Sequence, residues 1–166
     1  MNTLIVDAAQ YLPYVIVAAA VLVWLLLPRL DKVGLAAKGL VALALVGLLI
    51  VVGSALHTDP RPFVVDPSVK PLFAHPNDNG FPSDHTALAM TVAALVWVYR
   101  RTLGVVLGVL ALCVGAARVL AHVHHTQDIV AGALFGLVAA SLAAVAWRTV
   151  EPRVAARLGR TTAAAR

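Results

Sequence analysis

Residues 39–62 read GLVALALVGLLIVVGSALHTDPRP, an apolar run that ends abruptly in a polar segment containing two prolines. Residues 39–56 of this stretch hold no charged side chain, and a helix of about that length crosses the hydrocarbon core of a bilayer. In the six residues that follow, His57, Asp59 and Arg61 are all ionisable. The stretch therefore predicts a membrane-spanning helix with polar chemistry at one end.

Further apolar stretches of this kind give the expected fold. The 166-residue chain is 61% hydrophobic and 13% charged, about half the charge of an average soluble domain. We expect an all-α, polytopic membrane helical bundle of about five transmembrane helices, in one domain at 1–150 followed by a cytoplasmic Arg- and Ala-rich tail at 151–166. The expected spans are 12–27, 39–56, 86–99, 103–121 and 129–147. The stretch at 86–99 is short, so it must draw His85 into its helix.

Orientation is predicted from the thirteen Lys and Arg residues. With the N-terminus outside and the C-terminus cytoplasmic, ten of them fall on the inner side, as the positive-inside rule requires. These ten are Arg29, Lys32, Lys38, Arg100, Arg101, Arg148, Arg153, Arg157, Arg160 and Arg166. The polar segments 57–84 and 122–128 then share the extracytoplasmic face of what we expect to be a plasma-membrane protein.

The remaining segments predict little structure of their own. Residues 1–11 are modestly amphipathic, and we expect an interfacial helix there rather than a removable signal peptide. Loop 57–84 is rich in Pro, Asp, Asn and Gly, which predicts turns. Lone Cys113 excludes a disulfide framework. The net charge is +5, but the basic residues lie at the ends of apolar runs, so no nucleic-acid partner is expected.

All six histidines lie between His57 and His125, in a chain that otherwise has the composition of a membrane protein. The same region contains the HTDPRP segment at 57–62 and two further strings of polar residues. One is PSDHT at 82–86, and the other is an arginine, a histidine and an aspartate at 118, 124 and 128. Ionisable groups cost roughly 2.5–3.5 kcal/mol each at the centre of a spanning helix. Their concentration predicts a functional site.

Each string offers a recognisable chemical element. Ser83 or Asp84 is suited to cap a helix whose first turn holds His85, and a helix N-terminus attracts anions. His124 and Asp128 are four residues apart, so on a helix the carboxylate faces the imidazole and fixes its tautomer. A helix cap and a polar helix start are the simpler interpretations of these two strings.

Two arginines complete the set. Arg61 and Arg118 carry planar guanidinium groups that match phosphate oxygens, although either side chain could instead reach out to the lipid headgroups. Together with an oriented imidazole and a helix N-terminus, they supply what phosphoryl transfer requires: cations that hold the charged oxygens and a nucleophile. We expect His122 and His125 to be loop or rim residues.

These residues resemble the signatures of the type 2 phosphatidic acid phosphatase (PAP2) superfamily of membrane lipid phosphatases, from the second span to the fifth. Its motifs are Lys-x6-Arg-Pro, Pro-Ser-x-His and Ser-Arg-x5-His-x3-Asp. Here they read Arg61-Pro62, Pro82-Ser83-Asp84-His85, and Ala117-Arg118-x5-His124-x3-Asp128.

The resemblance implies a role for each matching position. His124 would be the nucleophile that forms a phosphohistidine, Asp128 would orient it, and His85 would be the general acid. The phosphoryl oxygens would be bound by Arg61, Ser83, Arg118 and the backbone at Asp84. The reaction would need no metal or other cofactor, and the partners would be a phosphorylated lipid substrate and the membrane lipids.

The chain departs from the family pattern at two positions. Ser54 stands where the resemblance implies a lysine, and Ala117 replaces the serine before Arg118. One phosphate ligand is therefore missing or supplied from elsewhere, and Lys70 is a weak candidate. The FPSDHT form at 81–86 and the QYLPY opening at 10–14 resemble the bacterial undecaprenyl-diphosphatase subgroup, which implies a polyprenyl diphosphate substrate at the outer face.

Several alternatives stay open. A zinc hydrolase would use some of His57, His75, His122, His124 and His125, although their spacing is irregular. A small transporter, a lipid-binding subunit or a catalytically weakened member that binds phosphorylated lipid would also be apolar. Among lipid phosphatases, phosphatidate, phosphatidylglycerophosphate and other prenyl phosphates are alternative substrates.

Overall fold

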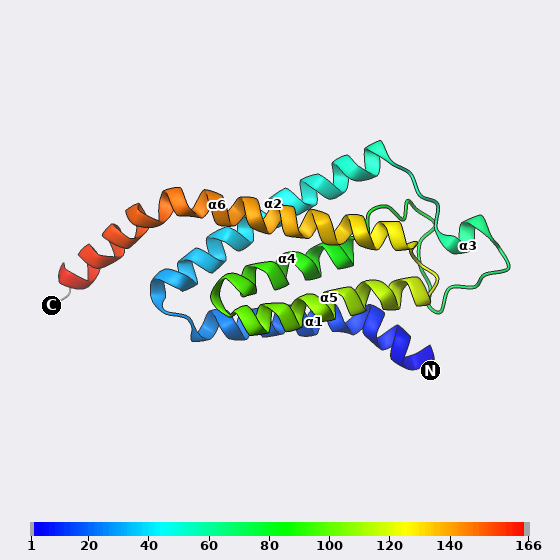
Figure 1. The fold of residues 1–166 in the computed structure, drawn as a ribbon, viewed down its shortest axis with the longest axis horizontal. Helices are drawn as coiled ribbons and strands as arrows, with labels where there is room; N and C mark the ends of the chain where they lie inside the picture. Colours follow the sequence, from blue (N-terminus) through cyan, green and yellow to red (C-terminus); the bar gives the residue numbers. More distant parts are fainter. Residues whose placement is uncertain (1, 165–166) are drawn as a thin grey trace.

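The computed structural model describes residues 2–164, with side chains up to residue 159, as an all-helical bundle. Its helices are α1 (Asn2–Leu26), α2 (Arg29–Leu56), α3 (Pro62–Val65), α4 (Asp84–Tyr99), α5 (Arg101–Leu120) and α6 (Thr126–Ala164). The expected all-α membrane fold is confirmed. Segments 57–83 and 121–125 lie at the same end of the bundle, whereas the turns between α1 and α2 and between α4 and α5 lie at the other (Figure 1).

Helix α4 lies at the centre of this arrangement. It packs against α1, α2, α5 and α6, and residues on several of its sides are buried. Four helices are long and apolar enough to cross a bilayer, namely α1, α2, α5 and α6 up to Gly159. Helix α4 has 16 residues and does not qualify. The expected number of about five spans thus becomes four candidate spans around one short, enclosed helix.

Two expected boundaries near the N-terminus are wrong. Residues 2–26 form one continuous helix rather than an interfacial helix followed by a span, even though Pro13 lies inside it. Helix α2 begins at Arg29, about ten residues before the apolar run, because residues 29–38 are mostly good helix formers and Pro28 occupies the N-cap position. Only Leu27 and Pro28 therefore separate the two helices.

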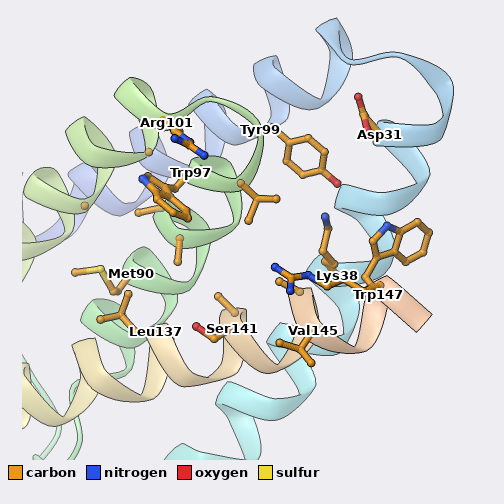
Figure 2. Close-up of a pocket in the computed structure, with 18 of the residues that line it drawn as sticks. Asp31, Lys38, Met90, Trp97, Tyr99, Arg101, Leu137, Ser141, Val145 and Trp147 are labelled. Atoms are coloured by element: carbon orange, nitrogen blue, oxygen red, sulfur yellow. The ribbon is translucent and has the colours of Figure 1, made fainter. Parts of the chain in front are cut away.

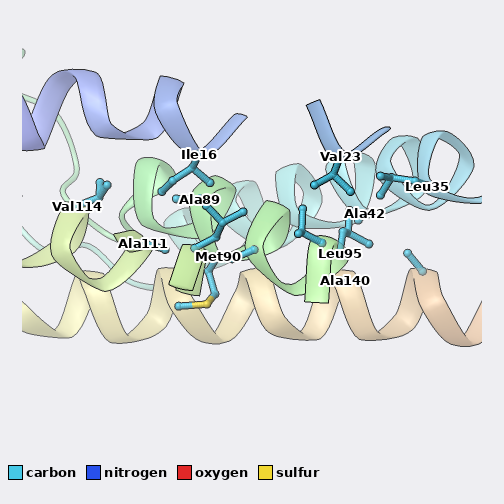
Figure 3. Packing of buried hydrophobic residues seen from close by; sticks show 14 of the residues in the cluster. Ile16, Val23, Leu35, Ala42, Ala89, Met90, Leu95, Ala111, Val114 and Ala140 are labelled. Atoms are coloured by element: carbon cyan, nitrogen blue, oxygen red, sulfur yellow. The ribbon is translucent and has the colours of Figure 1, made fainter. Parts of the chain in front are cut away.

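The core is built from small and branched apolar side chains (Figure 3). Ile16 and Val23 of α1, Ala89 of α4 and Val114 of α5 are buried in one cluster. By contrast, large apolar residues stay exposed on the outer surfaces, such as Leu56 at 82%. An apolar exterior around a core of this kind is what contact with lipid favours.

Glycines allow α6 to approach α4 closely. A Cβ atom on Gly132 would lie 2.4 Å from the carbonyl oxygen of Ser83, and one on Gly136 would lie 2.5 Å from that of Ala87. Small residues at helix interfaces permit such approaches in membrane bundles. The contact holds the start of α4 against the first turns of α6, which places Ser83 beside Asp128.

Candidate active site

Backbone hydrogen bonds join the long loop 57–83 to the short connection between α5 and α6 and to the first turn of α6. The amide of Leu72 donates to the carbonyl of Ala121 at 3.1 Å, and the amide of Ser83 donates to the carbonyl of Asp128 at 3.0 Å. Since each buried backbone bond restricts a loop, these contacts define the arrangement of the three polar strings. The strings meet at one end of the bundle.

The pair of His124 and Asp128 is fully enclosed at this end. His124 is 2% exposed and Asp128 is 0% exposed, and Nδ1 of the imidazole lies 3.2 Å from Oδ2 of the carboxylate. A carboxylate at this position accepts the Nδ1 proton and leaves the Nε2 lone pair available. Oδ2 also accepts a hydrogen bond from the amide of His125 at 2.9 Å, which fixes the carboxylate in turn.

Arg61 reaches the free side of the same imidazole. Its Nη1 lies 3.3 Å from Nε2 of His124 and donates to the carbonyl of Val123 at 2.6 Å. Its Nε donates to Oδ1 of Asp78 at 2.7 Å, and the whole residue is 5% exposed. The guanidinium is therefore aimed at the imidazole by two partners on different segments.

Arg118 approaches from the inner end of the site. It is 2% exposed; its Nη2 lies 3.0 Å from Nε2 of His75, and its Nη1 donates to the carbonyl of Ala9 at 3.4 Å. Its buried Nε has no hydrogen-bond partner among the residues that the structure describes. An unpaired donor on a buried cation is costly, and an anionic ligand would satisfy it.

The start of α4 supplies the second motif. Ser83 is its N-cap, with its hydroxyl accepting a hydrogen bond from the amide of Thr86 at 3.4 Å, and the side chain is fully buried. His85 stands in the first turn, as expected, and its Nδ1 lies 2.7 Å from Oδ1 of Asp84. Both side chains are solvent-exposed, and the Asp84 carboxylate interacts electrostatically with Arg118. The electrostatic effect of Arg118 on Asp84 links this helix start to the rest of the site.

A second polar network, which the sequence did not reveal, supports the first. Asp59 is 9% exposed and its Oδ2 accepts hydrogen bonds from Nε2 of Gln127 at 2.7 Å and from Nδ1 of His125 at 2.9 Å. Burial would raise the pKa of the Asp59 carboxyl, but its interactions with Gln127, Asp128 and His125 together hold that pKa below its ordinary value. His125 is thus part of the site's support, whereas His122 is an exposed loop residue, as expected.

Asn79 occupies the neighbourhood of Ser54, where the resemblance implies a lysine. Its Nδ2 donates to the carbonyl of Ser54 at 3.1 Å and to the carbonyl of His57 at 2.9 Å, and its Oδ1 accepts from the amide of Asp59. The position is therefore used to connect the end of α2 to the loop. Lys70 is exposed, and no hydrogen bond or ion pair of its ammonium is found within residues 2–159.

The histidines do not gather into a zinc site in the part of the chain that the structure describes. Asp59, His125 and Asp128 are the residues there whose potential ligand atoms come together, within 4.8 Å of one another. The oxygens that Asp59 and Asp128 present to His125 already accept its hydrogen bonds. The buried Oδ1 of Asp128 has no partner in the same region, so the donor set is compatible with a cation as well as with a hydrogen-bonded network.

Electrostatics favour a neutral His124. Burial lowers the pKa of this imidazole, and the charges of Arg118 and Arg61 lower it further against the opposing effect of Asp128. A neutral imidazole with its Nδ1 proton held by Asp128 can act as a nucleophile through Nε2. The resting contact between Nε2 and Arg61 must open when this happens.

A cavity lies at the other end of the bundle, away from these residues (Figure 2). It has a volume of about 920 Å³ and is lined by α2, α4, α5 and α6. Lys38 projects into it with its ammonium 4.3 Å from the ring centre of Tyr99, and Trp147 lies beside it. The cavity therefore contains none of the predicted site residues, and the polar cluster, rather than this hollow, is the candidate active site.

Comparisons with known proteins agree with this arrangement. Residues 35–152 match the family model of the PAP2 superfamily. The chain is 31% identical over 140 residues to "Bacitracin transport permease protein BcrC" of Bacillus licheniformis, which covers 84% of this chain and 68% of that protein. It is 29% identical over 83 residues to "Undecaprenyl-diphosphatase BcrC" of Bacillus subtilis (strain 168), which covers 50% and 42%.

The fold also matches a solved structure. The crystal structure of Aquifex aeolicus LpxE is similar with a TM-score of 0.70 at 26% identity, over 86% of this chain and 84% of that one. The family match spans most of the chain and includes all of the quoted motifs from Arg61 to Asp128. The chain therefore belongs to the PAP2 superfamily of membrane lipid phosphatases.

Proposed function

We propose that this protein removes the terminal phosphate from a polyprenyl diphosphate, such as undecaprenyl or decaprenyl diphosphate, through a phosphohistidine intermediate. One observation carries the proposal. A buried imidazole held by a carboxylate has its reactive Nε2 beside Arg61, and a second buried guanidinium, that of Arg118, has an unpaired donor. This combination is suited to an anion with several charged oxygens.

The reaction proceeds in two displacements. Nε2 of His124 attacks the terminal phosphorus, a nitrogen–phosphorus bond forms, and the bond from phosphorus to the bridging oxygen breaks. His85 protonates the departing lipid phosphate where required, and Arg61 and Arg118 neutralise the charge on the transferred group. Water then attacks the phosphohistidine, gives its proton to His85, and releases inorganic phosphate and free His124.

Proton handling depends on the placement of His85. Its ring is held at Nδ1 by Asp84, so Nε2 is the atom that remains to exchange a proton with a leaving group or water. The side chain is partly exposed at the first turn of α4. In-line displacement requires that His85 meet the leaving group on the side of the phosphorus opposite His124.

Two considerations support the lipid substrate and its membrane face. The B. subtilis relative is named an undecaprenyl-diphosphatase, and the apolar exterior of the bundle suits a long prenyl chain. The distribution of basic residues favours an extracytoplasmic site in the plasma membrane. The B. licheniformis relative is named a transport permease, but a buried nucleophile with its orienting carboxylate favours hydrolysis over transport.

Phosphate release by purified protein in detergent or nanodiscs tests the proposal. The panel contains undecaprenyl diphosphate, undecaprenyl phosphate, phosphatidate and phosphatidylglycerophosphate, each with and without excess EDTA. We expect fastest turnover of the diphosphate and full activity in chelator. Preference for phosphatidate would replace the substrate, loss of activity in EDTA would establish a metal requirement, and binding without turnover would indicate a non-catalytic relative.

A further inference from the structure

His75 lies inside the candidate active site although it belongs to none of the three motifs. It is carried by the long loop and is partly buried. Its Nε2 lies 3.0 Å from Nη2 of Arg118, and its ring centre is 6.2 Å from that of His124. The imidazole therefore stands beside the nucleophile and covers a guanidinium that would otherwise face the site.

The hydrogen bonds of His75 define its protonation state. Nδ1 lies 3.3 Å from the carbonyl of Pro76, so this nitrogen carries the proton and donates it. Nε2 consequently has a lone pair that accepts the hydrogen bond from Arg118. A neutral imidazole thus presents to Arg118 the kind of acceptor that a phosphate oxygen would present.

The surrounding charges explain why the imidazole is neutral in the absence of an anion. Burial lowers the pKa of His75, Arg61 lowers it next, and Arg118 and His124 add to this effect, with only the Pro76 carbonyl opposing them. A bound phosphate would bring negative charge to the same spot and reverse the balance. His75 would then hold a proton on each nitrogen and become a cation.

We propose that His75 is a phosphate ligand that becomes active on binding: the entering phosphate takes the Arg118 hydrogen bond, and Nε2 of His75 takes up a proton from solvent, keeps it, and donates a hydrogen bond to a phosphate oxygen. The proposal deepens the phosphatase function above and rests on it. It would also give the site a third cation in a chain that has Ser54 instead of the lysine implied by the family resemblance. Arg61 and Arg118 would then be joined by a third positive group only when substrate is present.

Sulfate binding tests this without turnover, because sulfate keeps one charge state between about pH 5.5 and 8, where imidazoles titrate. Sulfate affinity is measured across that range by calorimetry. The proteins are wild type, His75→Gln and the matched control His122→Gln, whose imidazole is exposed. We expect wild type and His122→Gln to bind sulfate more weakly as the pH rises. His75→Gln should bind about tenfold more weakly at the low end and show a flatter pH dependence.

The outcomes separate this inference from the proposed function. Equal affinity and equal pH dependence of wild type and His75→Gln, or no sulfate binding by wild type, would overturn the ligand role. Tighter binding and faster turnover by His75→Gln would also overturn it, and would make His75 a residue that only blocks Arg118. Thermal unfolding and size-exclusion profiles confirm that each variant is folded. If wild type hydrolyses no lipid phosphate, the phosphatase proposal fails, while the sulfate data still decide the role of His75.

Discussion

Nη1 of Arg61 lies 3.3 Å from Nε2 of His124, although the two residues are 63 positions apart in the chain. Arg61 follows the end of α2, and His124 precedes α6, so the contact depends on the packing of both helices. The guanidinium is fixed by Asp78 and the Val123 carbonyl rather than by the imidazole alone. The site is therefore assembled in advance of any ligand, which is a condition for efficient electrostatic catalysis.

Replacing the proposed nucleophile gives the most direct prediction. His124→Asn should abolish phosphate release while the protein stays folded, because the amide can form hydrogen bonds but cannot accept a phosphoryl group. The matched control is His122→Asn, since His122 is exposed two positions away and its φ of 60° suits asparagine. Near-normal turnover by His124→Asn, measured as released phosphate, would exclude His124 as the nucleophile.

Arg118→Lys should lower kcat/KM by about ten- to a hundredfold despite the conserved charge. A lysine ammonium cannot reproduce the planar fork that contacts His75 and Ala9 and leaves Nε for the ligand. Arg101→Lys, at the opposite end of α5, serves as the control and should keep normal kinetics. Equal kinetics of the two variants would show that Arg118 acts only through its charge.

The acid limb of kcat/KM should report the lowered pKa of His124. Because the pKa of His124 is lowered, this imidazole stays neutral at pH values down to the ordinary histidine pKa of about 6.5. Activity should therefore be retained down to that pH and should decrease at lower pH. Arg118→Gln removes one of the charges that lower this pKa, so its acid limb should move to higher pH. The ionisation of the substrate is the same for both proteins, so an unchanged limb would contradict the assignment.

Gly132→Ala should destabilise the protein and impair catalysis together. Its Cβ would lie 2.4 Å from the Ser83 carbonyl, which is backbone and cannot move without displacing the start of α4. Overpacking of this kind costs about 1–3 kcal/mol. Gly47→Ala is the control, because nothing lies within 4 Å of a Cβ there, and alanine improves helix propensity. Thermal unfolding of both variants measures the effect. Equal unfolding midpoints would show that the structure accommodates the added methyl group without loss of stability.

The sequence predicted those features that depend on local spacing. The four-residue interval from His124 to Asp128 predicted that they would share a helix face; the two side chains are in contact, although His124 precedes α6, which begins at Thr126. His85 was expected in the first turn of a helix, where it lies. Apolar runs located the four candidate spans found among the described residues, although the short run of α4 did not show that this helix is enclosed by its neighbours rather than a fifth candidate span.

Features that depend on loop conformation were not predictable. Nothing in the spacing of His75 relative to Arg118 indicates that the two meet, because the contact follows from the path of a loop without regular structure. Asp59 and His125 are likewise brought together by the packing of α2 against α6. Helix α1 extends back to Asn2 because no residue pattern ends the helix before the apolar run. Composition alone gives little information on where a helix begins.

The length of α4 has a consequence for how a substrate reaches the enzyme. A helix of 16 residues is about 24 Å long, shorter than the hydrocarbon thickness of about 30 Å. In a bilayer, its capped start, with Ser83 and His85, would lie deeper than the ends of the longer helices around it. A lipid anchored in the same leaflet would present its headgroup at this depth by sideways diffusion alone, whereas a water-borne phosphate ester would have to descend to it.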